Sequence, residues 1–453
     1  MSDGHGDKTV AESFDLIVKG GQAMTPSGAV EADIAIREGK IAAIGRIDQP
    51  AATILDAKGL HVLPGVIDTQ VHFREPGLTH KEDLGTGTAG AALGGVTAIF
   101  EMPNTSPNTS TADALDDKLR LAEGRVWCDV AFFVGATGEN AGKLDELERL
   151  PGASGIKIFM GSSTGTLLVA DDETLLRALR NGTRRVAIHA EDEYRLRERH
   201  ALVKDGADPT MHPVWRDVET ATRATSRVMR LAREAKRRVH ILHVTTAEEV
   251  PILAANKDLV TMEVTPQHLT LAAPDCYREL GTFAQMNPPI REMRHREALW
   301  QAVRDGIVDV IGSDHAPHTK DEKAKPYPQS PSGMPGVQTL LPLMLDHMNA
   351  GRLTLERLVD LTSAGPARIY NVAGKGRIAV GYDGDLSIVD LKAKRTIESK
   401  QQATRCGWTP FDGMAVTGWP KVTIVRGHIV MREDELIGRP IGQPVRFAEC
   451  LPD

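Results

Sequence analysis

The stretch Pro64-Gly65-Val66-Ile67-Asp68-Thr69-Gln70-Val71-His72-Phe73-Arg74-Glu75-Pro76-Gly77 joins a strand-like run to a group of reactive side chains. The run from Val66 to Val71 has the length of a buried strand, and Pro and Gly bound the stretch on both sides. The amide of Gln70 lies near the end of this run, and the imidazole of His72 and the guanidinium of Arg74 follow it. Reactive residues at the end of a strand are typical of the parallel sheets of α/β proteins, in which functional groups collect at that edge.

The same pattern recurs along the middle of the chain. Between residues 63 and 372, short apolar runs alternate with longer amphipathic stretches, which is the βα pattern of a parallel sheet. The candidate strands cover residues 66–71, 96–100, 129–134, 155–159, 185–189, 239–244, 261–264 and 308–312. An open doubly wound sheet would give a similar local pattern, but eight strands favour a TIM-type (β/α)8 barrel.

Both ends of the chain have a different pattern. Residues 14–19, 32–37 and 41–44 near the N-terminus alternate apolar and polar positions, as do residues 385–390 and 422–430 near the C-terminus. Neither group is large enough to close a core of its own. We therefore predict an α/β protein in which residues 1–62 and 373–453 form one small β-sandwich domain and residues 63–372 form the barrel.

Composition limits the classes of partner. The 453 residues include 54 basic and 61 acidic side chains, a net charge of -7, without a basic block that could follow a nucleic acid. The segment from Met1 to Ser13 is polar, and no apolar run reaches the roughly 18 residues of a membrane span. We expect a soluble, cytoplasmic protein. Cys128, Cys276, Cys406 and Cys450 lie far apart, which indicates ordinary thiols rather than disulfides or a zinc site.

Polar residues fall repeatedly at the ends of the predicted strands: Gln70, His72, Lys157, His189, His243 and Asp314. In a barrel these ends meet on one face, where catalytic residues collect. Lys157 is notable because an ammonium within an apolar strand is costly unless it is paired or neutral. It could also extend its charged end out of the barrel. His240 precedes His243 by three residues and should point in another direction, so we interpret it as structural.

The stretch from Pro64 to Gly77 resembles the first-strand signature of the dihydroorotases, which belong to the amidohydrolase superfamily. Ser313-Asp314-His315-Ala316-Pro317-His318 and Gly381-Tyr382-Asp383-Gly384-Asp385-Leu386 are also similar, so the resemblance covers nearly the whole chain. It implies that Lys157 reacts with carbon dioxide and that the resulting carbamate bridges two zinc ions. His189 and His243 would hold one ion, and His72 and Asp314 would hold the other.

The resemblance also implies a reaction. Asp314 would act as general base and acid, taking a proton from the metal-activated water and returning it to the leaving nitrogen. Arg74 would bind a substrate carboxylate, with Asn104, Asn287 and His318 as further substrate contacts. Turn chemistry beside proline is the ordinary explanation for each asparagine. The predicted activity is reversible hydrolysis of L-dihydroorotate to N-carbamoyl-L-aspartate in pyrimidine synthesis, with homo-oligomers as in related proteins.

Two positions depart from the family pattern. Gln70 replaces the first histidine of a His-x-His pair, and Gln267 stands where a histidine is usual. A neutral amide oxygen is a poor zinc ligand, so one or two zinc ions could bind, a single ion being held by His189, His243 and modified Lys157.

Other functions remain open. A catalytically silent subunit supporting aspartate transcarbamoylase and a hydrolase of hydantoin or allantoin are the alternatives, although the remaining residues form a chemically complete set. Residues 319–337, after the eighth strand, are long enough to form a lid.

Overall fold

Eight parallel strands form one sheet in the computed structural model, which describes residues 13–163 and 167–448. In sequence order they are β6 (Val66–Val71), β7 (Val96–Glu101), β8 (Asp129–Gly135), β9 (Ala153–Phe159), β10 (Val186–His189), β11 (Val239–Ile241), β12 (Val260–Val264) and β13 (Val310–Ile311). They lie side by side in that order. Each matches a predicted strand, and β13 is shorter than its predicted run.

The barrel closes between its first and last strands. Val71 pairs with His315 in parallel register, and the backbone N–H of His72 donates to the carbonyl of His315 at 2.7 Å. A side chain supports the same junction, because Asp68 Oδ1 accepts from the backbone N–H of Ser313 at 2.9 Å. Every residue of the eight strands is buried, which explains why apolar residues predominate on both faces of the sheet instead of alternating with solvent-facing polar ones.

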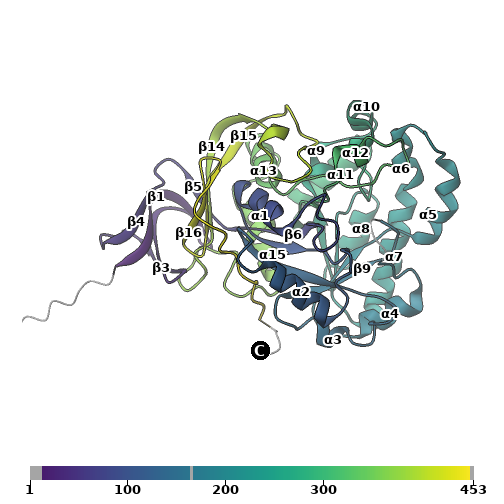
Figure 1. Ribbon diagram of the computed structural model, residues 1–453, viewed down its shortest axis with the longest axis horizontal. Helices are drawn as coiled ribbons and strands as arrows, with labels where there is room; N and C mark the ends of the chain where they lie inside the picture. The colour runs from purple at the N-terminus through teal and green to yellow at the C-terminus, as the bar shows by residue number, and fades with distance from the viewer. Residues whose placement is uncertain (1–12, 164–166, 449–453) are drawn as a thin grey trace, which may run out of the picture.

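Helices cover the outside of the barrel (Figure 1). Those that connect its strands are α1 (Leu84–Leu93), α2 (Ala112–Ala122), α3 (Leu144–Leu147), α4 (Asp172–Arg180), α5 (Glu193–Arg199), α6 (His212–Trp215), α7 (Val218–Ala235), α8 (Glu249–Ala254), α9 (Pro266–Thr270), α10 (Asp275–Leu280) and α11 (Met293–Arg304). After the last strand follow α12 (Lys320–Lys323), α13 (Leu340–Asn349), α14 (Leu355–Val359) and α15 (Gly365–Ile369). None of the described helices is long and apolar enough to cross a membrane.

Helix α7 shows how the sequence produces this outer layer. The Asp217 side chain caps its first turn by accepting from the backbone N–H of Thr220. Ala224, Val228 and Leu231 follow at spacings of four and three residues and are buried. This spacing places their side chains on one helix face, which packs against the barrel.

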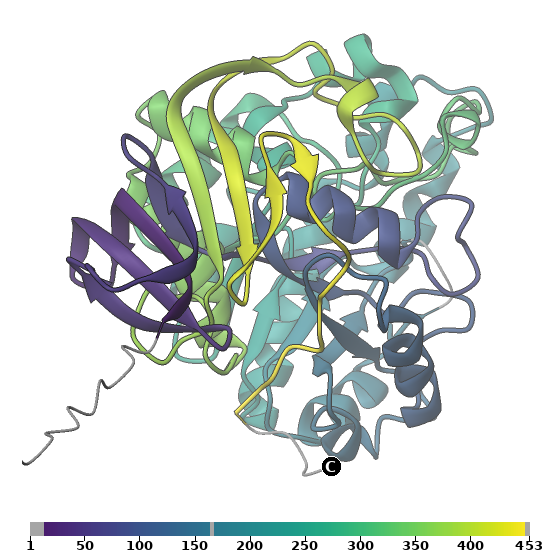
Figure 2. The same ribbon diagram turned by 60° about the vertical axis from the view of Figure 1, so that its left-hand side comes forward.

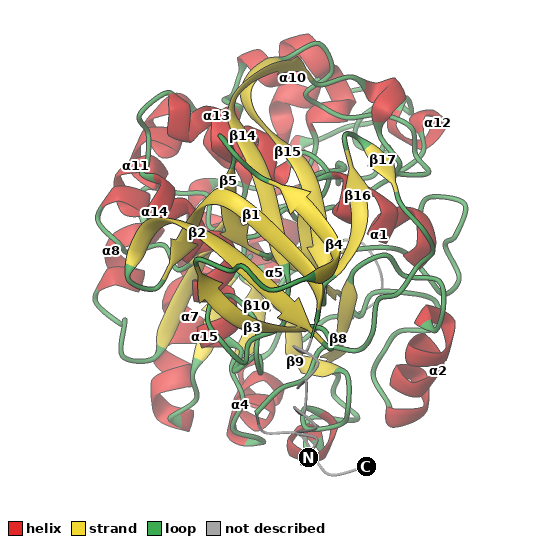
Figure 3. Cartoon of the chain, turned by 90° about the vertical axis from the view of Figure 1, so that its left-hand side faces the viewer, coloured by secondary structure: helices red, strands yellow, loops and turns green. Residues whose placement is uncertain are grey.

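The second sheet contains strands from both ends of the chain. Its strands are β1 (Phe14–Thr25), β2 (Gly28–Arg37), β3 (Lys40–Gly45), β4 (Ala51–Asp56), β5 (His61–Pro64), β14 (Leu386–Thr396), β15 (Ala415–Val425), β16 (His428–Arg432) and β17 (Glu435–Leu436). β5 pairs with β1 on one side and with β14 on the other, so it joins the two halves. Figure 2 shows these purple and yellow-green strands side by side, and Figure 3 shows the sheet against the barrel.

The predicted fold, a TIM-type barrel with a β-sandwich domain from both chain ends, is confirmed. The sandwich has an apolar core to which Val18, Ile36, Val62 and Ile388 contribute. Residues 1–12 and 449–453, which include part of the predicted β domain and Cys450, lie outside the described residues. The other cysteines are free and buried, as predicted.

The connection between β14 and β15, residues 397–414, reaches back to the barrel. The indole N–H of Trp408 donates to the carbonyl of His318 at 2.8 Å. The Trp408 side chain packs in an apolar cluster that includes Tyr277, Met286 and Met334 of the barrel. A segment of the β domain therefore supports the loop that follows the eighth barrel strand.

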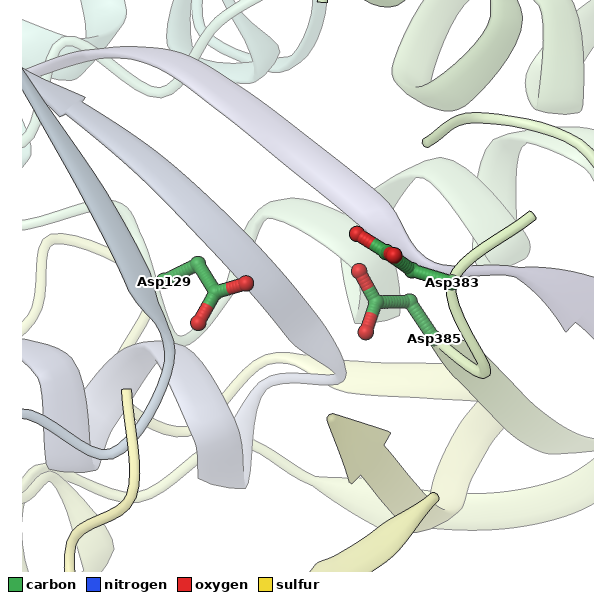
Figure 4. Close-up of side chains that lie close together, drawn as sticks. All are labelled: Asp129, Asp383 and Asp385. Carbon is green, nitrogen blue, oxygen red and sulfur yellow. The ribbon is translucent and has the colours of Figure 1, made fainter. Parts of the chain in front are cut away.

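A buried ion network ties the two domains together at Lys375. The ammonium contacts Asp129 Oδ2 at 2.6 Å and Asp383 Oδ2 at 3.1 Å, and it also donates to Asp385. Figure 4 shows Asp129 on β8 facing the other two aspartates, which precede β14. These contacts raise the pKa of Lys375 although burial alone would lower it, so the lysine stays charged. Arg426 also contacts Asp129.

We predict that Lys375→Met destabilises the protein by about 3–5 kcal/mol, because three buried carboxylates lose the ammonium that they share. Denaturant unfolding followed by circular dichroism measures the change. Lys394→Met is the matched control, since Lys394 is exposed on β14 and its loss should change stability by less than about 0.5 kcal/mol. Equal stabilities for the two variants would contradict a supporting role for the network.

Candidate active site

The ends of the barrel strands bring most of the predicted site residues to one cavity. Gln70 lies on β6, Lys157 on β9 and His189 at the end of β10, whereas His243 lies two residues after β11 and Asp314 three residues after β13. The predicted residues that line the cavity are Gln70, His72, Arg74, Asn104, Lys157, His189, His243, Asn287 and Asp314. His318 is not among the lining residues and lies behind Arg74.

Two histidines form a pair that fits a metal ion. His189 Nδ1 and His243 Nε2 are 3.1 Å apart, close to the about 3.3 Å between two nitrogen ligands of a tetrahedral zinc ion. The other ring nitrogen of His189 donates to Glu191 Oε2 at 2.9 Å, so Nδ1 presents a lone pair. Burial lowers the pKa of both imidazoles, which keeps them in the neutral form that binds metal.

Lys157 lines the same cavity, and its Nζ is 4.4 Å from the centre of the Phe159 ring. Within the described part of the chain it forms no ion pair with a carboxylate. Burial lowers its pKa to about 7, against the opposing effects of Asp314 and Glu263. A large fraction of neutral amine at physiological pH is what reaction with carbon dioxide requires, so the side chain fits a carbamate.

Gln70, His72 and Asp314 meet on the other side of the cavity. Gln70 Nε2 donates to Asp314 Oδ1 at 3.2 Å, and His72 Nε2 lies 3.2 Å from the same oxygen. His72 Nδ1 is 2.7 Å from Asn104 Oδ1, which fixes the orientation of the ring. The amide oxygen of Gln70 is buried, and no described residue donates a hydrogen bond to it.

Arg74 supplies a positive charge to the cavity wall. Its Nε donates to the carbonyl of Pro317 at 3.2 Å, but Nη1 is buried without a partner in the part of the chain that the structure describes. Nη2 is 3.3 Å from His318 Nε2. That nitrogen is also 3.0 Å from the carbonyl of Ser332, to which it must donate, so it cannot also accept from Arg74. Burial lowers the pKa of Arg74 only to about 10, so the guanidinium stays charged at neutral pH.

Three of these residues have a left-handed backbone. The φ angles are 64° at Arg74, 36° at His243 and 44° at Asp314. Residues with a side chain rarely adopt this conformation, and such strain tends to be kept at functional sites. Three of the nine described non-glycine residues with a positive φ thus line this cavity.

The structure adds residues to which the sequence analysis gave no role. Glu191 orients His189 and is itself held by Arg216, whose Nε donates to Glu191 Oε1 at 3.1 Å. The spacing of two residues between His189 and Glu191 is a sequence signal, because alternate residues of an extended segment share a side. Lys81 donates to His318 Nδ1 at 3.1 Å, a contact that no short motif indicates.

His240 and the aspartate cluster are separate from this site. His240 contacts Thr261 Oγ1 at 2.7 Å inside the barrel and is absent from the cavity wall, as its position in the strand predicts. Asp129, Asp383 and Asp385 have carboxylates close enough to share a metal ion. Lys375 already contacts all three, however, so the neutral imidazoles and Lys157 are the better candidate metal ligands.

A second cavity of about 680 Å³ adjoins the first and shares Ser163, Asn287 and Ser332 with it. Residues 328–332 of the predicted lid form part of its wall. The lid segment is tied down, because Lys323 Nζ donates to the carbonyls of Gln285 at 3.1 Å and Pro331 at 2.9 Å. The second cavity provides room beside the candidate metal ligands for a substituent or for entry of substrate.

Comparisons with known proteins identify the family. A model of the amidohydrolase family matches residues 61–430. A dihydroorotase from Halobacterium salinarum is 40% identical over 82% of this chain and 87% of its own length. An allantoinase from Deinococcus radiodurans is 35% identical over 96% of this chain and 99% of its own length.

A solved structure extends the agreement to the fold. The L-hydantoinase (dihydropyrimidinase) from Arthrobacter aurescens superposes with a TM-score of 0.90 at 32% identity, covering 95% of this chain and 99% of that chain. Members of the family are metal-dependent, and the three relatives are named for reactions on cyclic amides. The chain therefore belongs to the amidohydrolase family and is a cyclic amidohydrolase.

Proposed function

We propose that this chain is a dihydroorotase, which reversibly hydrolyses the ring amide of L-dihydroorotate to N-carbamoyl-L-aspartate in pyrimidine synthesis. The observation that carries the proposal is the buried guanidinium of Arg74, whose Nη1 has no partner among the described residues and which lines the same cavity as the candidate metal ligands. A buried charge without a partner is costly, and a substrate carboxylate would satisfy it. Dihydroorotate carries such a carboxylate.

The metal site in this proposal consists of His189, His243 and Lys157 as a carbamate. Two neutral nitrogen ligands and an anionic oxygen ligand suit zinc. When bound, zinc supplies Lewis acidity, which polarises a carbonyl group and makes water easier to deprotonate. Glu191 keeps His189 in the tautomer that offers Nδ1, and Arg216 holds Glu191.

Asp314 moves the proton in this proposal. Its carboxylate takes a proton from the attacking water while the water oxygen forms a bond to the ring carbonyl carbon. The bond between that carbon and the ring nitrogen then breaks, and Asp314 returns the proton to the nitrogen. Gln70 and His72 contact the same Asp314 oxygen and orient the carboxylate for this transfer.

Arg74 fixes the other end of the substrate. Its Nη1 and Nη2 can donate two parallel hydrogen bonds to one carboxylate, since Nη2 has no acceptor at His318. Asn287 lines the same cavity and can read an amide of the ring. Asn104 and His318 act differently, because Asn104 orients His72 and His318 fills the space behind Arg74.

A hydrolase of another cyclic amide is the second candidate function. The adjoining cavity of about 680 Å³ favours it, because a hydantoin with a large substituent would have room there. The allantoinase and L-hydantoinase among the similar proteins point the same way. A silent subunit that supports aspartate transcarbamoylase is the third, and it would show no turnover at all. The unpaired charge of Arg74 favours dihydroorotate.

We predict that Asp314→Asn lowers kcat for dihydroorotate by about 10²–10⁴-fold, because the amide cannot take the proton. Steady-state turnover of zinc-reconstituted protein measures the effect. Asp305→Asn is the matched control, since Asp305 is exposed at the end of α11 and should leave kcat unchanged. Turnover retained by the Asp314 variant would remove it as the base, whereas no turnover by the unaltered protein would rule out the dihydroorotase proposal.

We predict that Arg74→Met raises KM for dihydroorotate by about 10–100-fold, because the carboxylate loses charged hydrogen bonds worth about 1.5–3 kcal/mol. Turnover of an unsubstituted hydantoin, which has no carboxylate, should change much less. Arg46→Met controls for loss of an arginine, since the Arg46 side chain is 90% exposed. Equal effects on the acidic and the uncharged substrate would contradict the assignment of the carboxylate site.

We predict that Glu191→Gln weakens zinc binding by about 10–100-fold, because His189 loses the carboxylate that orients it. Competition with a chromophoric chelator measures the dissociation constant without reference to activity. Glu123→Gln, at an exposed position that ends α2, should bind zinc like the unaltered protein. If the Glu191 variant keeps full affinity and the same melting temperature, His189 is not a metal ligand.

A further inference from the structure

We infer that each chain holds a single divalent metal ion, at His189, His243 and Lys157, and that Gln70 serves as a hydrogen-bond donor to Asp314 instead of as a ligand for a second ion. The inference rests on the metal site proposed above and adds its stoichiometry. It depends on a contrast between the two sides of one cavity. The side with Gln70 presents an N–H group, whereas the side with His189 and His243 presents ring nitrogens that can bind a metal ion.

The first observation is the direction in which the Gln70 amide faces. Its Nε2 is 3.2 Å from Asp314 Oδ1. Turning the amide over would bring Gln70 Oε1 to that distance from a carboxylate oxygen, and two acceptors would then face each other. The carboxylate thus selects the orientation in which Gln70 points an N–H group at Asp314. An N–H group repels a cation and offers no lone pair.

The second observation is the state of the remaining amide atom. Gln70 Oε1 is buried and accepts no hydrogen bond from residues 13–163 or 167–448, while the Gln70 side chain lines the cavity. Because Nε2 donates to Asp314, Oε1 faces away from that carboxylate. A second metal ion would need both oxygens as ligands on the same side. It is available to accept a hydrogen bond from a ring N–H of a bound cyclic amide.

The opposite side of the cavity presents lone pairs. His189 Nδ1 has no proton of its own, because Nε2 donates to Glu191, so it accepts from His243 Nε2 at 3.1 Å. His243 Nδ1 has no partner among the described residues and can take that proton, which frees both convergent nitrogens for a metal ion. Lys157 lines the same cavity and forms no ion pair within the described residues. Two convergent nitrogens and a side chain that can become an anionic oxygen ligand make a three-ligand site with an open position, as in catalytic zinc centres.

Gln70 therefore has a positioning role in the proposed reaction. Its N–H holds Asp314 Oδ1, which His72 Nε2 also approaches at 3.2 Å, and Asn104 fixes the His72 ring in turn. A continuous hydrogen-bonded network thus occupies the place where a second ion would otherwise lie. It consists of Asn104, His72, Asp314 and Gln70. It keeps the Asp314 carboxylate in place without a second metal ion.

The test is the metal content of the protein after saturation with zinc and bicarbonate and removal of excess metal by gel filtration. Inductively coupled plasma mass spectrometry should give one zinc per chain for the unaltered protein and for Gln70→Met. Gln70→His, which restores a nitrogen lone pair, should give two. Gln401→His is the matched control, because it adds an imidazole at an exposed position after β14 and should leave the content at one.

A spectroscopic measurement tests the number of metal ions per chain independently, which matters if one variant folds poorly. Loaded with manganese, the unaltered protein should give the electron paramagnetic resonance spectrum of isolated ions, and Gln70→His should give the spectrum of exchange-coupled pairs. Gln70→Met should also lower kcat by about 10–100-fold, because Asp314 loses a hydrogen bond while the metal content stays the same.

The outcomes separate this inference from the proposed function. Two zinc ions in the unaltered protein, or one in Gln70→His, would overturn the inference and leave the dihydroorotase proposal standing. A metal content of zero in the unaltered protein would overturn both. One zinc ion together with no turnover of dihydroorotate would contradict the proposed function and keep the inference.

Discussion

Pairing between the first and last strands of the barrel is the constraint on which the site depends. Val71 lies beside His315, and Asp68 accepts from the backbone of Ser313. This register brings Gln70 and His72 into contact with Asp314, although 244 positions separate Gln70 from Asp314 in the chain. A shift of one residue would turn the strand's side chains to the opposite face and would remove the contact.

Burial then determines the charge of each group in the cavity. It lowers the pKa of His189 and His243, which keeps both imidazoles neutral, and lowers that of Lys157 to about 7. Arg74 remains charged because its pKa stays near 10. One enclosed space therefore contains neutral metal ligands on one side and a fixed cation for an anionic substrate group on another. This arrangement is the basis of the proposed dihydroorotase activity, since dihydroorotate carries both a ring amide and a carboxylate.

The β domain contributes to the site from a distance. The segment between β14 and β15 donates a hydrogen bond from Trp408 to the backbone of His318, which lies behind Arg74. Lys375 and its three aspartates fix β8 to the segment before β14. Loss of either contact would change how the two domains meet. The position of Arg74, the proposed carboxylate-binding residue, would then be less well defined, because its support comes from both domains.

The sequence by itself determined the strands of the barrel, the β domain from both chain ends, and the set of residues at the strand ends. Local patterns suffice for this because burial and spacing act on neighbouring residues. They also identified Gln70 as a departure from the family pattern. They could not show which atom of its amide faces Asp314, because that choice depends on a contact between β6 and the end of β13.

Other features were also decided only by the tertiary structure. The partner of His189, the unpaired Nη1 of Arg74 and the ammonium among the three aspartates each require groups from distant segments. The contacts of Asn104 with His72 and of His318 with Arg74 likewise join residues that are far apart in the chain, and the predicted substrate contacts of both residues stay predictions. A sequence motif specifies residue types at a spacing. Only packing determines which hydrogen bonds those residues have already made, and so which atoms remain free for a ligand.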